Sequence, residues 1–344
     1  MINSNKFLLP AIAIVAVGAV CSGTASADSV SDFYKGKTVT LIVGSGAGGG
    51  FGLNGRLVGN HIGKHIPGNP EVVMQFMRGG GGTKAANFVY NVSPKDGTVI
   101  SMPISSIVEN QLLRPKGSRF DGAKFHWLGS ITSLASVLSV WNTAPAKTIG
   151  DATKTQVILG ATSTNSSWYR MVKLMNPVVG TKFKIVTGYK GSRGVDLAME
   201  RQEIHGRAMV WASTKARRGD WLKAGKLVHL AQIGPYKLSD MPNVPRLIDM
   251  AKTEKQKTMV RFLHLTGLIG RALHTTPGVP AERVAALRKA FDDTMKDPAF
   301  IAEFKKRKLP FGPTSGKDLQ AFINKVIATP QSTIDELKTA LKGG

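Results

Sequence analysis

Cysteine, acidic residues and aromatic side chains are all scarce in this sequence. Cys21 is the only cysteine among 344 residues, and a chain without thiols beyond that point suits an oxidising compartment. The sequence has no G-x-S-x-G nucleophile elbow, no H-E-x-x-H zinc motif and no P-loop. After residue 27, no stretch reaches the roughly 20 apolar residues that a membrane helix needs. We therefore expect a soluble mature chain that is not an enzyme and has no metal or cofactor of its own.

The first 27 residues have the layout of a signal peptide. Lys6 supplies a positive charge, residues 7–20 form a short apolar run, and Ala25 and Ala27 place small residues where signal peptidase cuts. We expect cleavage after Ala27 and export of the rest. Lipidation of Cys21 stays open as an alternative because small residues precede it, although the valine immediately before it fits poorly.

Positive charge dominates the ionisable residues. The chain has 46 lysine and arginine residues against 22 aspartate and glutamate residues, and its formal net charge is +24. Such a field raises the local concentration of anions, so it suits an anionic ligand, but it is equally explained by a lineage whose exported proteins are basic. The charges are dispersed, and only residues 305–308 form a dense run. Nucleic-acid binding is not expected, because aromatic residues make up only 7% and no nucleic-acid motif is present.

Strands, glycine loops and helices alternate after the signal peptide. Residues 38–43 are β-branched and apolar as in a strand, residues 44–50 form a glycine loop, and residues 53–66 have helical spacing. The unit repeats as a strand at 71–77, a glycine loop at 78–83 and a helix at 84–91, followed by a third strand at 98–102. Alternation of this kind predicts an α/β fold with parallel sheets flanked by helices.

The pattern restarts in the second half of the chain and ends in helices. The length exceeds what one hydrophobic core usually holds, so we expect two lobes. Further strands are expected at residues 136–141, 155–159, 182–186, 204–211 and 227–232. Helices are expected at residues 280–295, 298–308 and 316–327, with prolines marking their starts and stops.

The two glycine loops indicate an anion site. Glycines at a strand end let backbone amides approach a ligand, and the N-terminus of the following helix favours negative charge. Both loops should reach the same sheet edge, because ligands of open α/β sheets lie at the carboxyl ends of strands. A pair of tight turns is the alternative. Gly44, Gly46 and Gly49 also match the dinucleotide pattern G-x-G-x-x-G, but no acidic residue ends the second strand to bind a ribose.

Two further groups of residues are candidates for binding. The loop at 160–167 follows a strand, precedes a helix and contains five hydroxyl side chains and an asparagine. We expect one hydroxyl to cap the helix and others to contact a ligand. His61 and His65 have a spacing that can ligate zinc, but no glutamate motif accompanies them, so a solvated helix face is the favoured interpretation.

Several short motifs stand in order along the mature chain. They are Phe33-Tyr34-Lys35-Gly36-Lys37, Gly48-Gly49-Gly50 with Arg56, the Arg78 to Gly82 loop, Lys95-Asp96-Gly97-Thr98, Gly188-Tyr189-Lys190-Gly191, Met241-Pro242-Asn243-Val244-Pro245 and Thr276-Pro277-Gly278-Val279-Pro280. In this order they resemble the periplasmic substrate-binding proteins of tripartite tricarboxylate transporters. The resemblance covers essentially the whole mature chain.

The resemblance implies an α/β, two-lobed type II periplasmic-binding-protein (Venus flytrap) fold, in which each lobe is a mainly parallel sheet flanked by helices. Lobe I would combine residues 28–133 with 258–344, and lobe II would be residues 134–257. A small organic carboxylate would lie between the lobes, its near end bound by backbone amides and waters of lobe I. The implied near-end residues are Gly49, Gly50, Phe51, Gly52, Gly80, Gly81 and Gly82, and the implied far-end residues are Thr162, Ser163, Asn165, Tyr189 and Lys190.

The resemblance also implies partners and exposes three departures. A periplasmic, monomeric protein would deliver its ligand to a large and a small membrane subunit; a protein that signals to a two-component sensor kinase is the alternative. Gly52 stands where the family usually has an aspartate, Gly79 where it usually has a proline, and His205 where an aspartate is common. If those acids orient the ligand, this protein binds something atypical; if they serve the fold, the carboxylate class stands.

Overall fold

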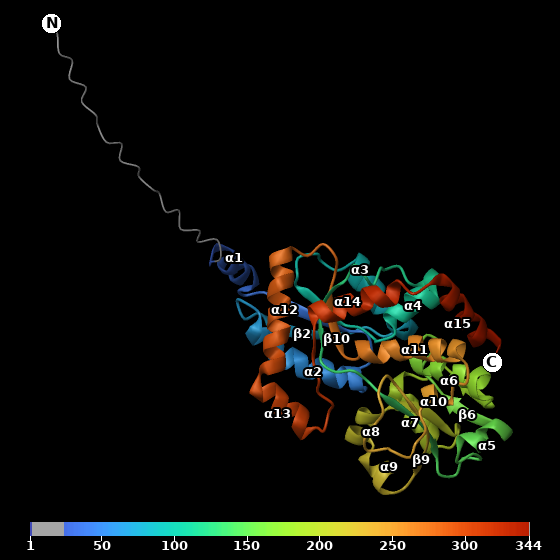
Figure 1. Cartoon of the computed structure of the whole chain (residues 1–344). Helices are drawn as coiled ribbons and strands as arrows, with labels where there is room; N and C mark the ends of the chain where they lie inside the picture. Colours follow the sequence, from blue (N-terminus) through green and yellow to red (C-terminus); the bar gives the residue numbers. More distant parts are fainter. Residues whose placement is uncertain (2–23, 344) are drawn as a thin grey trace.

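Two β-sheets, each flanked by helices, organise the chain into two lobes (Figure 1). This computed structural model describes residue 1 and residues 24–343. Most of the predicted signal peptide, residues 2–23, lies outside the described residues, so its cleavage stays a prediction. In the described part of the chain, no helix is long and apolar enough to cross a membrane.

The first sheet is built on the predicted strand-loop-helix units. Its strands are β1 (Thr38–Val43), β2 (Glu71–Phe76), β3 (Val99–Met102), β4 (His126–Ser130), β10 (Ala272–Thr275) and β11 (Thr314–Ser315). They lie in the order β11-β4-β10-β3-β1-β2. β1 pairs in parallel with β2 and β3, whereas β10 is antiparallel to β3 and β4, and β11 is antiparallel to β4.

The second sheet comes from the middle of the chain. Its strands are β5 (Ser136–Trp141), β6 (Val157–Gly160), β7 (Phe183–Val186), β8 (Gly206–Val210) and β9 (Leu227–Ile233). They lie in the order β7-β6-β8-β5-β9. β6 is parallel to β7 and β8, and β5 is antiparallel to β8 and β9.

Both sheets are therefore mixed, and this corrects the expectation of mainly parallel sheets. The parallel part of each sheet is β2-β1-β3 in one lobe and β7-β6-β8 in the other. Parallel neighbours need a crossover connection within their own lobe. β5 and β10 instead enter their sheets from the opposite lobe, and each runs antiparallel to the strand beside it.

Helices cover both sheets. Those around the first sheet are α1 (Thr24–Tyr34), α2 (Gly50–Ile62), α3 (Thr83–Asn91), α4 (Ile107–Leu113), α12 (Ala281–Lys296), α13 (Pro298–Lys306) and α14 (Gly316–Ile327). Those around the second are α5 (Ile149–Lys154), α6 (Ser167–Val179), α7 (Gly191–Glu200), α8 (Trp211–Arg217), α9 (Gly219–Lys223) and α10 (Leu247–Met250). Short 3-10 turns are η1 (Gly63–His65), η2 (Gly80–Gly82) and η3 (Pro115–Gly117).

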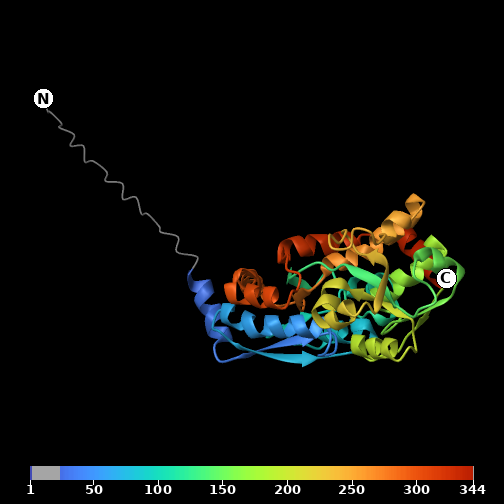
Figure 2. The ribbon, with the colours of Figure 1, turned by 90° about the horizontal axis from the view of Figure 1, so that it is seen from below.

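Two helices lie across the boundary between the lobes. α11 (Glu254–Ile269) and α15 (Gln331–Gly343) both contact α4 of the first lobe and α6 of the second. Figure 2 shows the blue N-terminal elements and the green elements of the second lobe at opposite ends of the molecule, with the C-terminus beside the green end. The lobe boundaries expected from the resemblance stay a prediction, and the C-terminal helix packs on both lobes.

The chain crosses between the sheets at two neighbouring places. One crossing follows β4 and leads into β5, and the other leads from α11 into β10. The Leu134 amide donates to the Gly267 carbonyl at 2.7 Å, and the Arg271 amide donates to the Thr132 carbonyl at 3.1 Å. These bonds hold the two crossings side by side.

Candidate functional site

A cavity of about 680 Å³ lies between the two lobes. Five loops contribute to its walls, and each follows a parallel strand and precedes a helix or a helical turn. They are residues 44–49 after β1, 77–79 after β2, 103–106 after β3, 161–166 after β6 and 187–190 after β7. The carboxyl ends of parallel strands are the usual ligand position in open α/β sheets, so this cavity is the candidate site.

The first glycine loop is fixed over the N-terminus of α2. Gly49 is the N-cap residue of that helix, with φ −96° and ψ 177°, and no side chain caps it. Arg56 donates from Nη1 to the Ala47 carbonyl at 3.1 Å and ties the loop to the helix. A Cβ at Gly52 would lie 2.3 Å from the Ala47 oxygen. Gly52 therefore supports the loop from beneath and is absent from the cavity wall, and no aspartate fits at this position with the present loop.

The second glycine loop has a backbone that only glycine adopts readily. Gly79, Gly80, Gly81 and Gly82 have φ values of 141°, 56°, 64° and 92°. Side chains other than hydrogen are disfavoured at positive φ, and proline is restricted to a φ near −65°. The glycine at position 79, where a proline is usual in the resembled family, is thus required by this loop conformation.

The second lobe contributes polar side chains to the opposite wall. Thr162 and Ser163 line the cavity before α6, and Tyr189 and Lys190 line it before α7. Burial, and then the charge of a nearby glutamate, raises the pKa of Tyr189, so its hydroxyl stays protonated and can donate at neutral pH. Ser166 occupies the N-cap position of α6, but its hydroxyl makes no capping hydrogen bond. The expectation that a hydroxyl of this loop caps the helix is therefore wrong.

Four helices direct N-termini without side-chain caps at the cavity. They are α2, α3, α6 and α7, whose N-cap residues Gly49, Gly82, Ser166 and Lys190 all line it. Elsewhere, side chains of Thr148, Thr253, Asp297 and Ser315 cap α5, α11, α13 and α14. The helices α4, α8, α9, α10 and α12 also lack a side-chain cap, and their N-cap residues do not line the cavity, so it is the convergence of four such N-termini that distinguishes this site. The N–H groups of a first helical turn have no carbonyl partner within the helix, and the helix dipole favours negative charge there. The arrangement is therefore suited to binding an anion.

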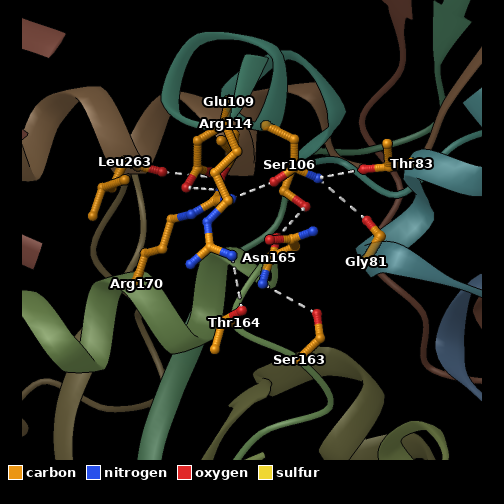
Figure 3. A network of polar contacts seen from close by, with 12 residues as sticks. Gly81, Thr83, Ser106, Glu109, Arg114, Ser163, Thr164, Asn165, Arg170 and Leu263 are labelled. Atoms are coloured by element: carbon orange, nitrogen blue, oxygen red, sulfur yellow. Dashed lines mark hydrogen bonds and ion pairs between the residues drawn. The ribbon is translucent and has the colours of Figure 1, made fainter. Parts of the chain in front are cut away.

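Asn165 connects the two lobes and is not part of the cavity wall. Its Nδ2 donates to the Gly80 carbonyl at 3.1 Å, and Ser106 Oγ donates to its carbonyl at 3.4 Å. Beside it, Arg114 Nη1 donates to Thr164 Oγ1 at 3.0 Å (Figure 3). The residue expected to contact the far end of a ligand thus closes one side of the cleft by holding the second glycine loop.

A buried ion pair supports this contact between the lobes (Figure 3). Arg170 of α6 donates from Nη1 to Glu109 Oε1 of α4 at 2.5 Å, and the two side chains are 2% and 1% exposed. Arg170 also donates to Asn110 Oδ1. Burial raises the pKa of Glu109, and the Arg170 charge opposes that rise.

All the predicted site residues except Gly52 and Asn165 line the cavity, although whether they bind a ligand is untested. Those that line it are Gly49, Gly50, Phe51, Gly80, Gly81, Gly82, Thr162, Ser163, Tyr189 and Lys190. The sequence analysis missed Ser105, Trp168, Ser192, Arg193 and Arg207, which also line it. Arg207 gave one usable signal, since it is an arginine inside an otherwise apolar strand.

The remaining candidates from the sequence serve the fold. His61 Nδ1 and His65 Nε2 each lie 3.3 Å from Asp297 Oδ2, and their side chains are 11% and 22% exposed, so they pack against α13 and do not form a solvated face. A hydrogen bond from Lys64 is the main reason that the pKa of Asp297 lies far below its usual range. Among the described residues, no group of three potential ligands could hold a metal ion. His205 Nδ1 accepts from the Ile158 amide at 3.0 Å, next to the strands.

Comparisons with known proteins establish the fold. Neither the family models nor the curated proteins give a match to this sequence. The solved structure of a TctC solute-binding protein from Polaromonas matches with 18% identity over 88% of this chain and 99% of that chain, at a TM-score of 0.60. R. palustris Rpa4515 with adipate matches with 20% identity over 88% and 97%, at 0.66. MatC from Rhodopseudomonas palustris with bound malate matches with 17% identity over 87% and 99%, at 0.67. The predicted two-lobed periplasmic-binding-protein fold is confirmed.

Proposed function

We propose that this protein is a periplasmic solute-binding protein of the tripartite tricarboxylate transporter type. It captures a small organic carboxylate between its lobes and delivers it to a large and a small membrane subunit. The observation that carries the proposal is the convergence of four uncapped helix N-termini on one cavity between the lobes. The order of family motifs along the chain and the fold it shares with structures that contain adipate or malate support the same function.

The ligand would complete the contact between the lobes. The amides of Gly49 and Gly82 already donate to the Gly46 and Gly79 carbonyls. Backbone amides of Gly50, Phe51, Gly80 and Gly81 would therefore bind one carboxylate, while Thr162, Ser163, Tyr189 and Lys190 would contact the rest of the ligand. Closure about the two neighbouring chain crossings would exclude water from these groups. Exclusion of water strengthens each hydrogen bond to the anion, because the local dielectric constant falls. The closed, monomeric form would then dock on the membrane subunits.

A ligand screen on the protein purified from the periplasm of an expression host tests this proposal. Di- and tricarboxylates, aromatic acids, amino acids and phosphates are compared by thermal unfolding and calorimetry. A ligand at 100 times its dissociation constant adds about 2.7 kcal/mol to the free energy of unfolding, which a melting curve detects. A selective shift with one organic acid is the expected result. Absence of any shift across all carboxylates would refute the carboxylate function.

Lys190 provides a matched variant for the second-lobe wall. Lys190 is exposed at the N-terminus of α7, where its ammonium could pair with a distal carboxylate. We expect Lys190→Ala to weaken dicarboxylate binding about tenfold, as for loss of one charge-assisted hydrogen bond. Lys289→Ala, on the exposed face of α12 with its side chain 76% exposed, is the control and should bind normally. Equal affinity in both variants and in the wild type would remove Lys190 from the site.

A further inference from the structure

A second, smaller cavity adjoins the main one between the lobes. Its volume is about 60 Å³, which gives room for one small polar group. The two cavities share part of their walls, namely Gly50, Phe51, Trp168, Ser192 and Arg207. The charged residues in the wall of the smaller cavity are the four arginines Arg207, Arg217, Arg218 and Arg271 and the single carboxylate of Asp196.

Asp196 already has both of its oxygens occupied. Its Oδ1 accepts from Arg207 Nη1 at 2.7 Å, and its Oδ2 accepts from Arg218 at 2.7 Å from Nη2 and 3.0 Å from Nε. The Asp196 side chain is 3% exposed. Two of the four guanidinium groups therefore have a direct counter-ion, and neither Arg217 nor Arg271 shares it.

Arg271 is buried with unused donors. It is 2% exposed, and its Nε and Nη1 have no hydrogen-bond partner. Its guanidinium carbon lies 3.9 Å from the centroid of the Phe51 ring, and its Nη2 would lie 2.8 Å from a Cβ built on Gly50, so it sits directly against the start of α2. Arg217 donates from Nη1 to the Gly48 carbonyl at 2.9 Å, and its Nε is also buried without a partner.

Burial of these donors without an anion is unfavourable. A charge removed from water needs a partner, and burial, followed by the charge of Arg217, lowers the pKa of Arg271 to about 9. Arginine nevertheless remains protonated at neutral pH, so an anion is the available partner. The guanidinium fork pairs well with planar or tetrahedral oxyanions. Arg271 precedes β10 of the first lobe and Arg217 ends α8 of the second, so an anion between them would join the lobes.

The geometry points to an anion subsite between Arg271 and Arg217, beside the first turns of α2 and α7 that also line the main cavity. It takes one compact oxyanion, either the distal carboxylate of a ligand whose other end lies in the main cavity or a free inorganic oxyanion. The inference rests on the proposed function and deepens it, because it places the second negative charge against the buried Arg271 and the partly buried Arg217 instead of the exposed Lys190.

Matched ligands and matched variants test the subsite in the protein purified from the periplasm. Dicarboxylates of three to eight carbons are compared with monocarboxylates of equal length, and with sodium sulfate and sodium phosphate, by calorimetry and thermal unfolding. The variants are Arg271→Gln and Arg217→Gln. Arg201→Gln, whose side chain is 64% exposed, removes the same charge at the surface and is the control.

The expected result is loss of oxyanion binding in the two site variants alone. The wild type and the Arg201 variant should bind a dicarboxylate, sulfate or phosphate at least about tenfold more tightly than Arg271→Gln does, while monocarboxylates bind all proteins alike. If only dicarboxylate affinity depends on Arg271, the occupant of the subsite is the distal carboxylate of the ligand. If sulfate or phosphate affinity depends on Arg271, the occupant is a free inorganic anion. If Arg271→Gln does not fold, Arg217→Gln decides.

Two results would overturn the subsite. One is equal dicarboxylate, sulfate and phosphate binding by the wild type and both site variants, and the other is a wild type stabilised by none of these anions. The outcomes separate the subsite from the proposed function. Dicarboxylate binding that neither Arg271→Gln nor Arg217→Gln weakens leaves the carboxylate receptor standing without the subsite, whereas sulfate or phosphate binding that depends on Arg271, with no carboxylate bound, supports the subsite and refutes the carboxylate function.

Discussion

Replacement of Gly52 with alanine should loosen the first glycine loop and weaken ligand binding together. A Cβ on this residue would lie 2.3 Å from the Ala47 oxygen and 2.7 Å from its carbonyl carbon. Non-bonded heavy atoms pack at roughly 3.5 Å, so the loop has to retreat by about 1 Å. The atoms in the way belong to the backbone, and no side-chain rotation relieves the contact.

The size of the effect follows from two opposing terms. Overpacking of this kind costs about 1–3 kcal/mol, while alanine in a helix gains up to about 1 kcal/mol over glycine. The net loss is about 1–2 kcal/mol, which corresponds to a melting temperature lower by roughly 2–3 °C for a chain of this length. A displaced loop also loses the equivalent of about one hydrogen bond to the ligand, and this weakens affinity up to about tenfold.

Thermal unfolding and calorimetry with the ligand found in the screen measure both effects. Gly48→Ala is the matched control for unfolding, because a Cβ there meets nothing within 4 Å. Its melting temperature should stay the same or rise slightly, since alanine restricts the unfolded chain. If Gly52→Ala melts and binds like the wild type, or if both variants lose stability equally, the packing argument for Gly52 is refuted.

Two further predictions concern buried charge. Arg170→Met leaves Glu109 buried without its partner and should lower the free energy of unfolding, measured in urea, by about 3–5 kcal/mol. The double variant Arg170→Met with Glu109→Gln should regain most of this free energy, because the buried charge is removed as well. A double variant no more stable than Arg170→Met would contradict the argument. Burial lowers the pKa of the fully buried His274 from its ordinary 6.5 to about 3, so the unfolded state takes up the proton first as pH falls. The stabilising contribution of neutral His274 is complete above pH 6.5 and declines toward pH 3, and at pH 5 it is smaller by about 2 kcal/mol. Between pH 7 and pH 5 the melting temperature should therefore fall more steeply for the wild type than for His274→Phe.

The elements that could be predicted from the sequence are those whose signals are local. β1 and β5 have the bounds expected from their β-branched, apolar residues, and α14 occupies the expected residues 316–327. The glycine runs correctly marked where strands end and helices begin. These signals depend on neighbours along the chain, so no knowledge of distant contacts was needed.

The sequence analysis missed elements whose stability depends on distant partners. β4 and β10 are short, and every residue of β10 is buried, so neither shows an alternation of polar and apolar residues. Each is completed by strands from another part of the chain, and this pairing makes the first sheet mixed. α15 was also missed, since its place against α4 and α6 depends on both lobes.

The sequence by itself determined that two glycine loops stand at strand ends before helices, and this made an anion site between lobes predictable. Only the tertiary structure decided which side chains complete that site. Asn165 donates a hydrogen bond to the Gly80 carbonyl across the lobes, and Arg271 and Arg217 line the same small cavity beside the start of α2. The reason is physical: a glycine's backbone freedom is a property of its own position, whereas the burial and pairing of an arginine depend on residues brought together from both lobes.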